Sequence, residues 1–366
     1  MGDDELHEQE DDEARNHPRR GAHRATVYPS PPLRLSVIVP VFNDRQALVR
    51  CVGALIASAG PEVEVMVVDD ASTDDTASAA ARLPVRLLCL PTNAGPAAAR
   101  NHGAEHARGD ILLFVDSDVI VGPGTLERVM AVFEARPDMA AVFGSYDASP
   151  EAAGVVSRYK NLLHHFVHQH GDARASTFWA GCGAIRRRVF AELGGFDEKR
   201  FRRPSIEDIE LGYRLRRAGH RILLDKALQG THLKRWTLGS LLRTDIKARA
   251  IPWARLILTT RQPVDDLNLR QDQRLSAALT ALAVVCLLLA PLWTGLALIA
   301  GALLITVIVL NRRLYGFFVR HGGVVFAGAC LLLHWLYYLY SGAAFLGVWM
   351  SVRLGRSGAT RAGNGR

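Results

Sequence analysis

Two aspartates, Asp116 and Asp118, follow an apolar run and are separated by one serine in the stretch LLFVDSDVI. An apolar run that ends in polar residues is typical of a buried parallel strand that reaches a loop at the edge of its sheet. Aspartate is common at strand ends, so the pair by itself fits an ordinary turn. Carboxylates are also preferred ligands of Mg²⁺ and Mn²⁺, so the pair equally fits a site for a divalent cation and a phosphate-bearing ligand.

Two further apolar runs end in the same way. LSVIVPVFND ends in Asn43 and Asp44, and VEVMVVDD ends in Asp69 and Asp70. Segments with helical character follow these runs, and this alternation predicts an α/β fold whose parallel sheet is covered on both faces. Ligands in such sheets bind at the carboxyl ends of the strands. Acidic residues at three strand ends of one edge therefore favour a cation site over solvated loop acids.

A second group of carboxylates lies in SIEDIELGYRL, where Ile206 and Ile209 fit the apolar face of a helix and Glu207, Asp208 and Glu210 the other face. The simpler explanation of these acids is that an exposed helix start favours negative charge. The functional explanation is that a carboxylate within hydrogen-bond reach of a hydroxyl can act as its general base.

Several motifs in order resemble the nucleotide-sugar-binding half of a GT-A glycosyltransferase of family 2: SVIVPVFND, VVDDASTDDT, NAGPAAARN and FVDSD. GCGAIRRRVFAELGGFDE and PSIEDIELGYRLRRAG resemble the acceptor-side segments of the same family. The resemblance spans roughly residues 35–240. It implies a GT-A fold, in which a Rossmann-like mixed sheet binds a nucleotide-diphospho-sugar. It also implies an inverting, hexosyltransferase-type enzyme that requires Mg²⁺ or Mn²⁺.

The resemblance assigns donor binding to Pro40, Phe42, Asn43, Asp69, Asp70, Asn93, Gly95, Arg100 and Asp116. It implies that Phe42 packs near the base and that Asp70, with Asp69 beside it, accepts a hydrogen bond from the base. Asp118 would bind the metal, and Asp116 would contact the ribose or donor sugar beside it.

On the acceptor side, the resemblance makes Asp208 the general base and lets Glu207 position the acceptor. His232, Arg235 and Trp236 resemble the Gln-x-x-Arg-Trp motif of processive polysaccharide synthases, with His in place of Gln. His232 would reach the metal or the diphosphate, Arg235 would pair with the diphosphate, and Trp236 would stack on an acceptor sugar. An amphipathic segment that contacts the membrane is the alternative for this stretch.

LLHHFVHQH places His164 and His168 on one helix face, a spacing that suits zinc, but no Cys or acid follows at a matching spacing. An aromatic-lined acceptor groove or a plain surface helix is therefore favoured. Trp179 is expected to contact the acceptor, with a place in the core as the alternative. The five cysteines show no pairing pattern, which fits a reducing compartment without disulfides.

Composition divides the chain into further parts. Residues 1–33 are acidic and poor in apolar side chains, which predicts a disordered tail without a signal peptide. The catalytic domain is expected over 34–245, and 246–274 mixes Arg and Lys with Leu, Ile and Trp, as interfacial amphipathic segments do. Residues 275–350 form a transmembrane region of two to three spans, and 351–366 a basic tail.

The basic stretch NRRLYGFFVRHGG is expected on the cytoplasmic side, together with the catalytic domain, in a multi-pass protein of the cell (inner) membrane. A full third span would place the basic tail outside, and the aromatic stretch HWLYYLYSG suits an interface, so a re-entrant or interfacial pair is the alternative to three spans. The net charge of +8 fits a membrane-facing surface, and we expect no nucleic-acid partner.

These observations predict a membrane-anchored glycosyltransferase that moves a sugar from a nucleotide-diphospho-sugar, expected to be a UDP-sugar, to a lipid-linked or glycan acceptor. A processive polysaccharide synthase is one alternative, and it would need a partner membrane subunit because few spans are visible here. A catalytically inactive scaffold that binds nucleotide sugars is the other, although it would have no need of Asp116, Asp118 and Asp208 together.

Overall fold

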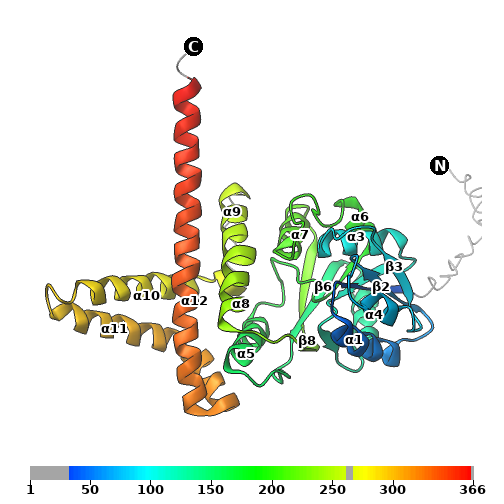
Figure 1. Ribbon diagram of the computed structural model, residues 1–366, viewed down its shortest axis with the longest axis horizontal. Helices are drawn as coiled ribbons and strands as arrows, with labels where there is room; N and C mark the ends of the chain where they lie inside the picture. Colours follow the sequence, from blue (N-terminus) through cyan, green and yellow to red (C-terminus); the bar gives the residue numbers. More distant parts are fainter. Residues whose placement is uncertain (1–32, 261–266, 364–366) are drawn as a thin grey trace, which may run out of the picture. The chain divides into compact units, whose positions relative to one another are not determined.

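The computed structural model describes residues 33–260 and 267–363 (Figure 1). The strands are β1 Leu35–Val41, β2 Val63–Asp69, β3 Arg86–Cys89, β4 Ile111–Val115, β5 Val119–Val121, β6 Met139–Tyr146, β7 Cys182–Arg186 and β8 Arg221–His232. The α-helices are α1 Arg45–Ser58, α2 Thr76–Ala80, α3 Pro96–His106, α4 Thr125–Ala135, α5 Val155–His170, α6 Arg187–Glu192, α7 Glu207–Arg217, α8 Leu238–Arg243, α9 Ile251–Thr260, α10 Gln271–Leu289, α11 Gly295–Leu310 and α12 Arg312–Gly363. A π-helix, η1, spans Thr244–Ala250, and a 3₁₀ turn, η2, spans Leu267–Leu269.

The strands form one mixed sheet in the order β3-β2-β1-β4-β7-β6-β8-β5. Strands β1 to β4 are mutually parallel, as the alternation of strands and helices predicts. Strand β7 then runs antiparallel to both of its neighbours, β4 and β6, and β5 runs antiparallel to β8. The sheet is therefore parallel from β3 to β4 and mixed beyond β4, which confirms the predicted α/β class with a mixed sheet.

Alternate residues of the buried strands feed two apolar cores, one on each face of the sheet. In β1, Val37 and Val39 pack into the cluster that also holds side chains of α1 and α4. Ile38 between them points to the other face, where it joins side chains of α3, α6 and α7. This two-residue alternation is the geometry of a strand buried on both faces. It holds the strand ends, and the loops that follow them, on a rigid base.

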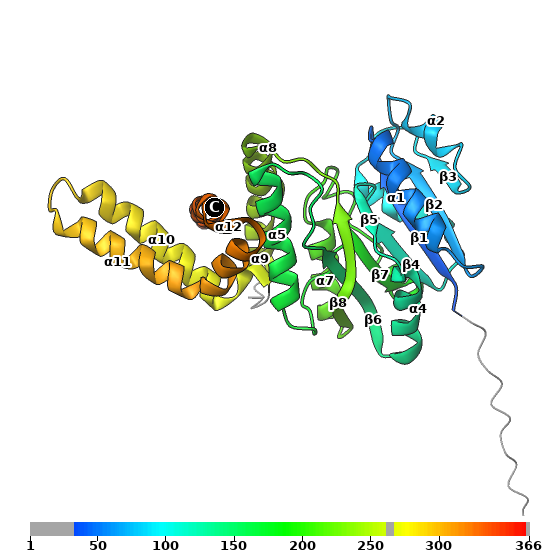
Figure 2. The same ribbon diagram turned by 90° about the horizontal axis from the view of Figure 1, so that it is seen from below.

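Two of the C-terminal helices are long and apolar enough to cross a membrane, Gln271–Leu289 and Arg312–Leu354. Helix α11 is apolar but has only 16 residues, and it packs against α10 as a hairpin (Figure 2). At a rise of about 1.5 Å per residue such a helix falls short of the roughly 30 Å hydrocarbon core. Gly323 interrupts α12 with φ 76° and ψ 178°.

The expected interfacial segment, 246–274, contains the end of η1, all of α9 and the start of α10. Residues 1–32 of the predicted disordered tail and 364–366 of the predicted basic tail lie outside the described residues. The described part of the basic tail, up to Gly363, continues helix α12.

Candidate active site

The acidic strand ends lie side by side because β1 pairs in parallel with both β2 and β4. Asp69 is the last residue of β2, and Asp116 directly follows β4. The loop after β1 carries Phe42, whose side chain is 45% exposed, whereas Pro40 is buried within the strand. Phe42 is therefore the better placed of these two predicted residues to meet a ligand at this edge.

Asn43 fixes the loop after β1 to the loop after β2. Its φ of 51° lies in the left-handed region, which asparagine tolerates better than most residues. Its Oδ1 accepts hydrogen bonds from the backbone N–H of Thr73 at 2.7 Å and of Asp74 at 3.4 Å. In this structure Asn43 shapes the edge by joining two loops.

Asp70 fixes the next loop along the sheet. Its Oδ1 accepts from the Ala94 N–H at 2.7 Å, and its Oδ2 accepts from the Gly95 N–H at 2.8 Å and from Asn93 Nδ2 at 3.1 Å. Burial raises the pKa of Asp70, and the two backbone hydrogen bonds oppose this rise. Both oxygens thus have protein donors, and the predicted hydrogen bond from Asp70 to a base stays a prediction.

Asp69, the last residue of β2, has one carboxylate oxygen to which a ligand could donate a hydrogen bond. Its Oδ2 accepts from the Ser72 N–H at 3.0 Å, while its buried Oδ1 has no hydrogen-bond partner among the described residues. A buried acceptor without a donor is unusual in a folded protein. A donor group of a bound ligand would satisfy it.

Gly95 begins α3 at a close approach of two backbones. Its φ is +94°, and a Cβ built on it would lie 2.4 Å from the carbonyl oxygen of Arg202. Any side chain here would displace the segment that precedes the carboxylates of α7. Gly95 therefore allows the start of α3 to lie against the segment that leads into α7.

Arg100 of α3 joins the two carboxylate groups directly. Its Nη2 lies 2.6 Å from Asp116 Oδ1, and its Nη1 lies 2.9 Å from Glu207 Oε1. Burial alone would lower the pKa of the guanidinium, but Asp116 and Glu207 raise it above its usual value. The sequence motifs predict Arg100 as a part of the nucleotide wall, and the structure gives it this additional, central contact.

Asp118 and His232 face one another across 3.5 Å, measured from Oδ2 to Nε2. Burial opposes ionisation of Asp118, but His232 and Lys234 together lower its pKa. The backbone also holds the pair, because the Leu233 N–H donates to the Asp118 carbonyl at 2.9 Å. The fold thus brings two predicted metal ligands together. Asp118 lies in the turn between β4 and β5, and His232 is the last residue of β8.

The separation of Asp118 and His232 suits two ligands that share one cation at about 2.1 Å. Asp116, the third predicted ligand, instead directs Oδ1 to Arg100. Carboxylate and imidazole donors fit Mn²⁺ and Mg²⁺, with the remaining positions open to phosphate and water. Asp118 and His232 are therefore the residues that would hold such an ion.

Tyr146, at the end of β6, is a site residue that the sequence motifs do not reveal. Its ring stacks on His232 with centroids 4.1 Å apart at 9°, and meets the edge of Trp179 at 4.9 Å. Burial, followed by the Asp118 and Asp116 charges, raises its pKa well above the usual value. The one available signal was its position at a strand end, where the sequence AAVFGSY turns polar.

His164 and Trp179 complete an aromatic wall beside Tyr146. The His164 ring lies 4.3 Å from Tyr146 and 4.8 Å from Trp179, centroid to centroid. The His168 ring lies behind it at 3.9 Å, and its Nδ1 bonds to the Gly144 carbonyl at 3.0 Å. Burial lowers the pKa of His168 to about 4, so it is a neutral packing residue at physiological pH.

Asp208 lies at the start of α7 with its carboxylate held by backbone donors. Oδ1 accepts from the Ile209 N–H at 2.7 Å and Oδ2 from the Ala180 N–H at 3.2 Å. Burial and the neighbouring Glu207 charge raise its pKa to about 7. A carboxyl group with such a pKa is suited to accept a proton near neutral pH.

The segment HLKRW differs from the predicted arrangement. Lys234 follows the predicted metal residue His232 by two positions, and its charge, after that of His232, helps to lower the pKa of Asp118. Arg235 is exposed, and its charge acts on Glu151. Trp236 is 7% exposed and packs among side chains of α5 and α12. The predicted contacts of Arg235 with diphosphate and of Trp236 with a sugar would require both side chains to move, and they stay predictions.

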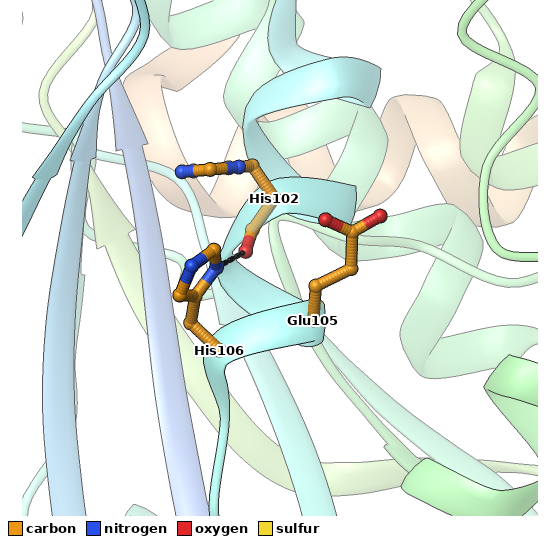
Figure 3. Close-up of side chains that lie close together, drawn as sticks. All are labelled: His102, Glu105 and His106. Atoms are coloured by element: carbon orange, nitrogen blue, oxygen red, sulfur yellow. Dashed lines mark hydrogen bonds between the residues drawn. The ribbon is translucent and has the colours of Figure 1, made fainter.

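A separate group of ligand-type side chains lies at the last turns of α3. His102, Glu105 and His106 have ligand atoms within 4.8 Å of one another, and they form the one such triplet found in the described part of the chain (Figure 3). The His106 Nδ1 bonds to the His102 carbonyl at 2.9 Å. These side chains are largely exposed, so this second candidate cation cluster must be controlled for in any metal experiment.

Comparison with known proteins bears on the family resemblance and the fold of this chain. Residues 36–194 match the family model described as Glycosyl transferase family 2. This segment of the chain is therefore similar to family 2 glycosyltransferases. The matched residues include Asp116 and Asp118, whereas Glu207, Asp208 and His232 lie C-terminal to them.

Among curated proteins, a pre-mycofactocin glycosyltransferase of Mycobacterium tuberculosis is 33% identical over 215 residues, which are 54% of this chain and 43% of that protein. The succinoglycan biosynthesis protein ExoO of Rhizobium meliloti is 39% identical over 99 residues, 26% of this chain and 28% of its own. The chain thus spans less than half the length of these relatives.

Among solved structures, the mannosyltransferase PcManGT of Pyrobaculum calidifontis, in complex with GDP-Man and Mn²⁺, aligns with a TM-score of 0.52 at 19% identity. The alignment covers 86% of this chain and 87% of that one. This likeness supports the GT-A fold of this chain.

Proposed function

We propose that this protein is an inverting glycosyltransferase that transfers a hexose from a nucleotide-diphospho-sugar to an acceptor hydroxyl. The observation that carries the proposal is the double contact of Arg100, which joins Asp116 of the donor edge to Glu207 of the acceptor side. Because Asp208 follows Glu207 directly, a base near neutral pKa lies beside the donor edge. The arrangement suits a single displacement in which donor and acceptor meet at one point.

In that displacement the acceptor oxygen attacks the anomeric carbon from the side opposite the diphosphate. Asp208 takes the proton of the acceptor hydroxyl as the new C–O bond forms. The bond between the anomeric carbon and the diphosphate oxygen breaks, and its electron pair leaves with the nucleoside diphosphate. Glu207, held by Arg100 and by the Ser205 N–H at 2.9 Å, keeps the neighbouring acceptor position fixed. The anomeric configuration inverts.

Asp118 and His232 would hold Mg²⁺ or Mn²⁺, which supplies positive charge for the departing diphosphate. Lys234 would add a second positive charge on the same side. The Mn²⁺ and GDP-Man complex of the structural neighbour supports a nucleotide-sugar donor with a divalent cation. We expect a UDP-sugar here, with GDP-mannose as the main competing donor.

We further propose that the protein works at the cytoplasmic face of the cell membrane, as a multi-pass protein anchored by its C-terminal helices. Two helices of sufficient length and apolarity support this anchoring. Anchoring would hold the site at the depth of a lipid-linked acceptor or a nascent glycan, which raises the effective concentration of the acceptor.

The test is donor turnover by the full chain in nanodiscs with Mn²⁺ or Mg²⁺. A panel of UDP- and GDP-sugars is supplied with and without a membrane lipid extract, and the released nucleoside diphosphate is measured. We expect one donor to be turned over in a metal-dependent way, with loss of turnover in Asp118→Ala and in Asp208→Ala. The double variant His102→Ala/His106→Ala, which removes the second cation cluster, should keep the metal dependence.

Donor binding without release under every condition would instead support the inactive scaffold. A ladder of products from one acceptor would support a processive synthase, which would then call for a search for a partner membrane subunit.

A further inference from the structure

The last turns of α3 carry three ligand-type side chains that lie outside the candidate active site. His102, Glu105 and His106 each bring one ligand atom to within 4.8 Å of the others (Figure 3). Residues three and four apart are neighbours on a helix surface, so this spacing places all three on one face of α3. Two histidines one turn apart are a common pair of metal ligands on a helix, and a carboxylate is a suitable third ligand.

The hydrogen bond of His106 determines which of its ring nitrogens is available to a cation. Its Nδ1 lies 2.9 Å from the His102 carbonyl oxygen, which can only accept, so Nδ1 carries the hydrogen. In a neutral imidazole the other nitrogen, Nε2, then keeps its lone pair for a metal. Metal-binding histidines commonly donate their second N–H to a backbone carbonyl in this way, which orients the ring.

The position at the end of a helix explains one of these imidazoles but not the pair. The helix dipole favours a cationic side chain in the last turn, where His106 lies. The ring centroids of His102 and His106 are 4.5 Å apart, so two imidazolium charges would repel each other. One divalent ion shared by two neutral rings avoids this repulsion, and the Glu105 carboxylate supplies negative charge to it.

A surface pocket of about 240 Å³ lies beside these ligands. His102 and Glu105 line it, together with Glu198 and with Thr92 of the loop before α3. Glu198 accepts a hydrogen bond from Asn101 Nδ2 at 2.8 Å, and it brings a second carboxylate to the pocket. An ion held by the three ligands of α3 would therefore keep a fourth position open to water on the side of the pocket.

The donor set selects the kind of ion. Imidazole nitrogen suits Zn²⁺, Cu²⁺ and Ni²⁺, whereas Mg²⁺ prefers oxygen, and a given site binds Zn²⁺ more tightly than Mn²⁺. Three protein ligands of the nitrogen and carboxylate type with a fourth, open position are typical of zinc. Rotation of these surface side chains can bring their ligand atoms to the roughly 2.0–2.2 Å that zinc requires.

We propose that α3 carries a Zn²⁺ site whose ligands are His102, Glu105 and His106. The site goes beyond the proposed glycosyl transfer and is separate from the cation expected in the active site. A bound ion would link the last two turns of α3, and it would thereby stabilise the helix that also carries Arg100.

The test is Zn²⁺ and Mn²⁺ binding, measured by calorimetry on the full chain in zwitterionic nanodiscs after removal of any purification tag. All variants are made in the Asp118→Ala background, which removes a ligand of the other cation. They are His102→Ala, His106→Ala, the double variant His102→Ala/His106→Ala, and Glu105→Gln. Because the three side chains lie at the surface, these substitutions should leave the fold intact.

Two matched controls accompany these variants. His170 is also an exposed histidine at the end of a helix, and its Nδ1 bonds to the Phe166 carbonyl at 2.9 Å, but a phenylalanine replaces the second histidine one turn earlier. His170→Ala therefore removes an equivalent imidazole without a partner ring of its kind. Cys89→Ser controls for Zn²⁺ bound to an exposed thiol.

We expect the double variant to bind one Zn²⁺ per chain fewer than the background protein. Either single histidine variant should lower the Zn²⁺ affinity by roughly tenfold or more, because a nitrogen ligand is lost, and Glu105→Gln should lower it less. Zn²⁺ should bind at least about tenfold more tightly than Mn²⁺. His170→Ala and Cys89→Ser should each change the Zn²⁺ affinity by less than about twofold.

Co²⁺ provides a spectroscopic readout of the same site. A tetrahedral Co²⁺ complex absorbs visible light more strongly than the octahedral aqueous ion, so the band should appear in the background protein and be absent from the double variant. Unchanged Zn²⁺ stoichiometry in the double variant would overturn the proposal. A loss in His170→Ala or Cys89→Ser as large as that in His106→Ala would also overturn it, because Zn²⁺ would then bind to scattered surface groups.

Discussion

The donor edge and the acceptor side of this site are built in different ways. At the donor edge, loops that follow neighbouring parallel strands hold each other through short-range contacts, such as those of Asn43 with Thr73 and of Asp70 with Gly95. The proposed acceptor side gathers residues from β6, α5, α7 and β8, which are far apart in the chain. Arg100 is the residue that connects the two halves.

The difference shows that one half is determined by the regular pairing of parallel strands and the other by how separate elements pack together. Each single substitution at the donor edge should therefore lower the affinity for the donor only slightly. Changes at the acceptor side, or at Arg100, should affect catalysis or stability strongly, because few contacts replace those that are lost. The predictions below test this contrast, from the largest expected effect to the smallest.

Asp208→Asn should lower the transfer rate by roughly 10²- to 10⁴-fold, because it removes the general base while it keeps the volume of the side chain. Donor affinity should stay within about twofold, since Asp208 belongs to the acceptor side. Turnover is followed by nucleoside diphosphate release and donor affinity by calorimetry. The control is Glu192→Gln, on the exposed surface of α6, which should leave both unchanged. Equal loss of donor affinity and rate in Asp208→Asn would contradict the separation of the two halves.

Arg100→Met should destabilise the fold by about 3–5 kcal/mol, because it leaves Asp116 and Glu207 close together without their shared cation. Thermal unfolding of the protein in nanodiscs measures the effect. Adding Glu207→Gln to Arg100→Met should recover part of the loss, since one of the two unpaired charges is then removed. If the double variant is as unstable as Arg100→Met alone, then the guanidinium stabilises the fold by packing and not by joining the carboxylates.

The pH profile should show an acid limb set by Asp208. Because burial and Glu207 raise the pKa of this carboxyl to about 7, the base is protonated and inactive at lower pH. Transfer, measured as kcat/KM, should fall about tenfold per pH unit below that value and level off above it. Glu207→Gln removes the neighbouring negative charge, so it should shift the limb to lower pH. An unshifted limb would assign it to another group.

Lys234→Ala should raise the KM for the donor by about tenfold, because a charge-assisted contact to diphosphate is lost. Arg235→Ala, one residue further along the same exposed segment, serves as the matched control and should change the KM by less than twofold. The opposite ranking would support the assignment of Arg235 that the motif resemblance implies, and would show that this segment rearranges when donor binds.

The sequence is informative where a regular pattern of strands or of a helix determines the position of a residue. The acidic ends of β1, β2 and β4 and the helical acids of α7 could all be predicted, because strand pairing and helix periodicity determine their positions. Tyr146 and Lys234 could not, since their partners are set by how β6, β8 and α5 meet. Trp236 shows the same limit, because an aromatic residue that suits a sugar equally suits a packed interface, and only the fold decides where it lies.

The cluster that contains Trp236 has a practical meaning for anyone who wishes to isolate the part of the chain that precedes the C-terminal helices. Tyr159 and Leu162 of α5 are covered by Phe317 and Phe318 of α12. Arg158 is also bound to the His321 carbonyl at 2.6 Å. A chain cut after η1 would expose this aromatic face to water, where contiguous apolar surface promotes aggregation. Purification of this protein therefore has to retain the C-terminal helices, even for assays with water-soluble ligands.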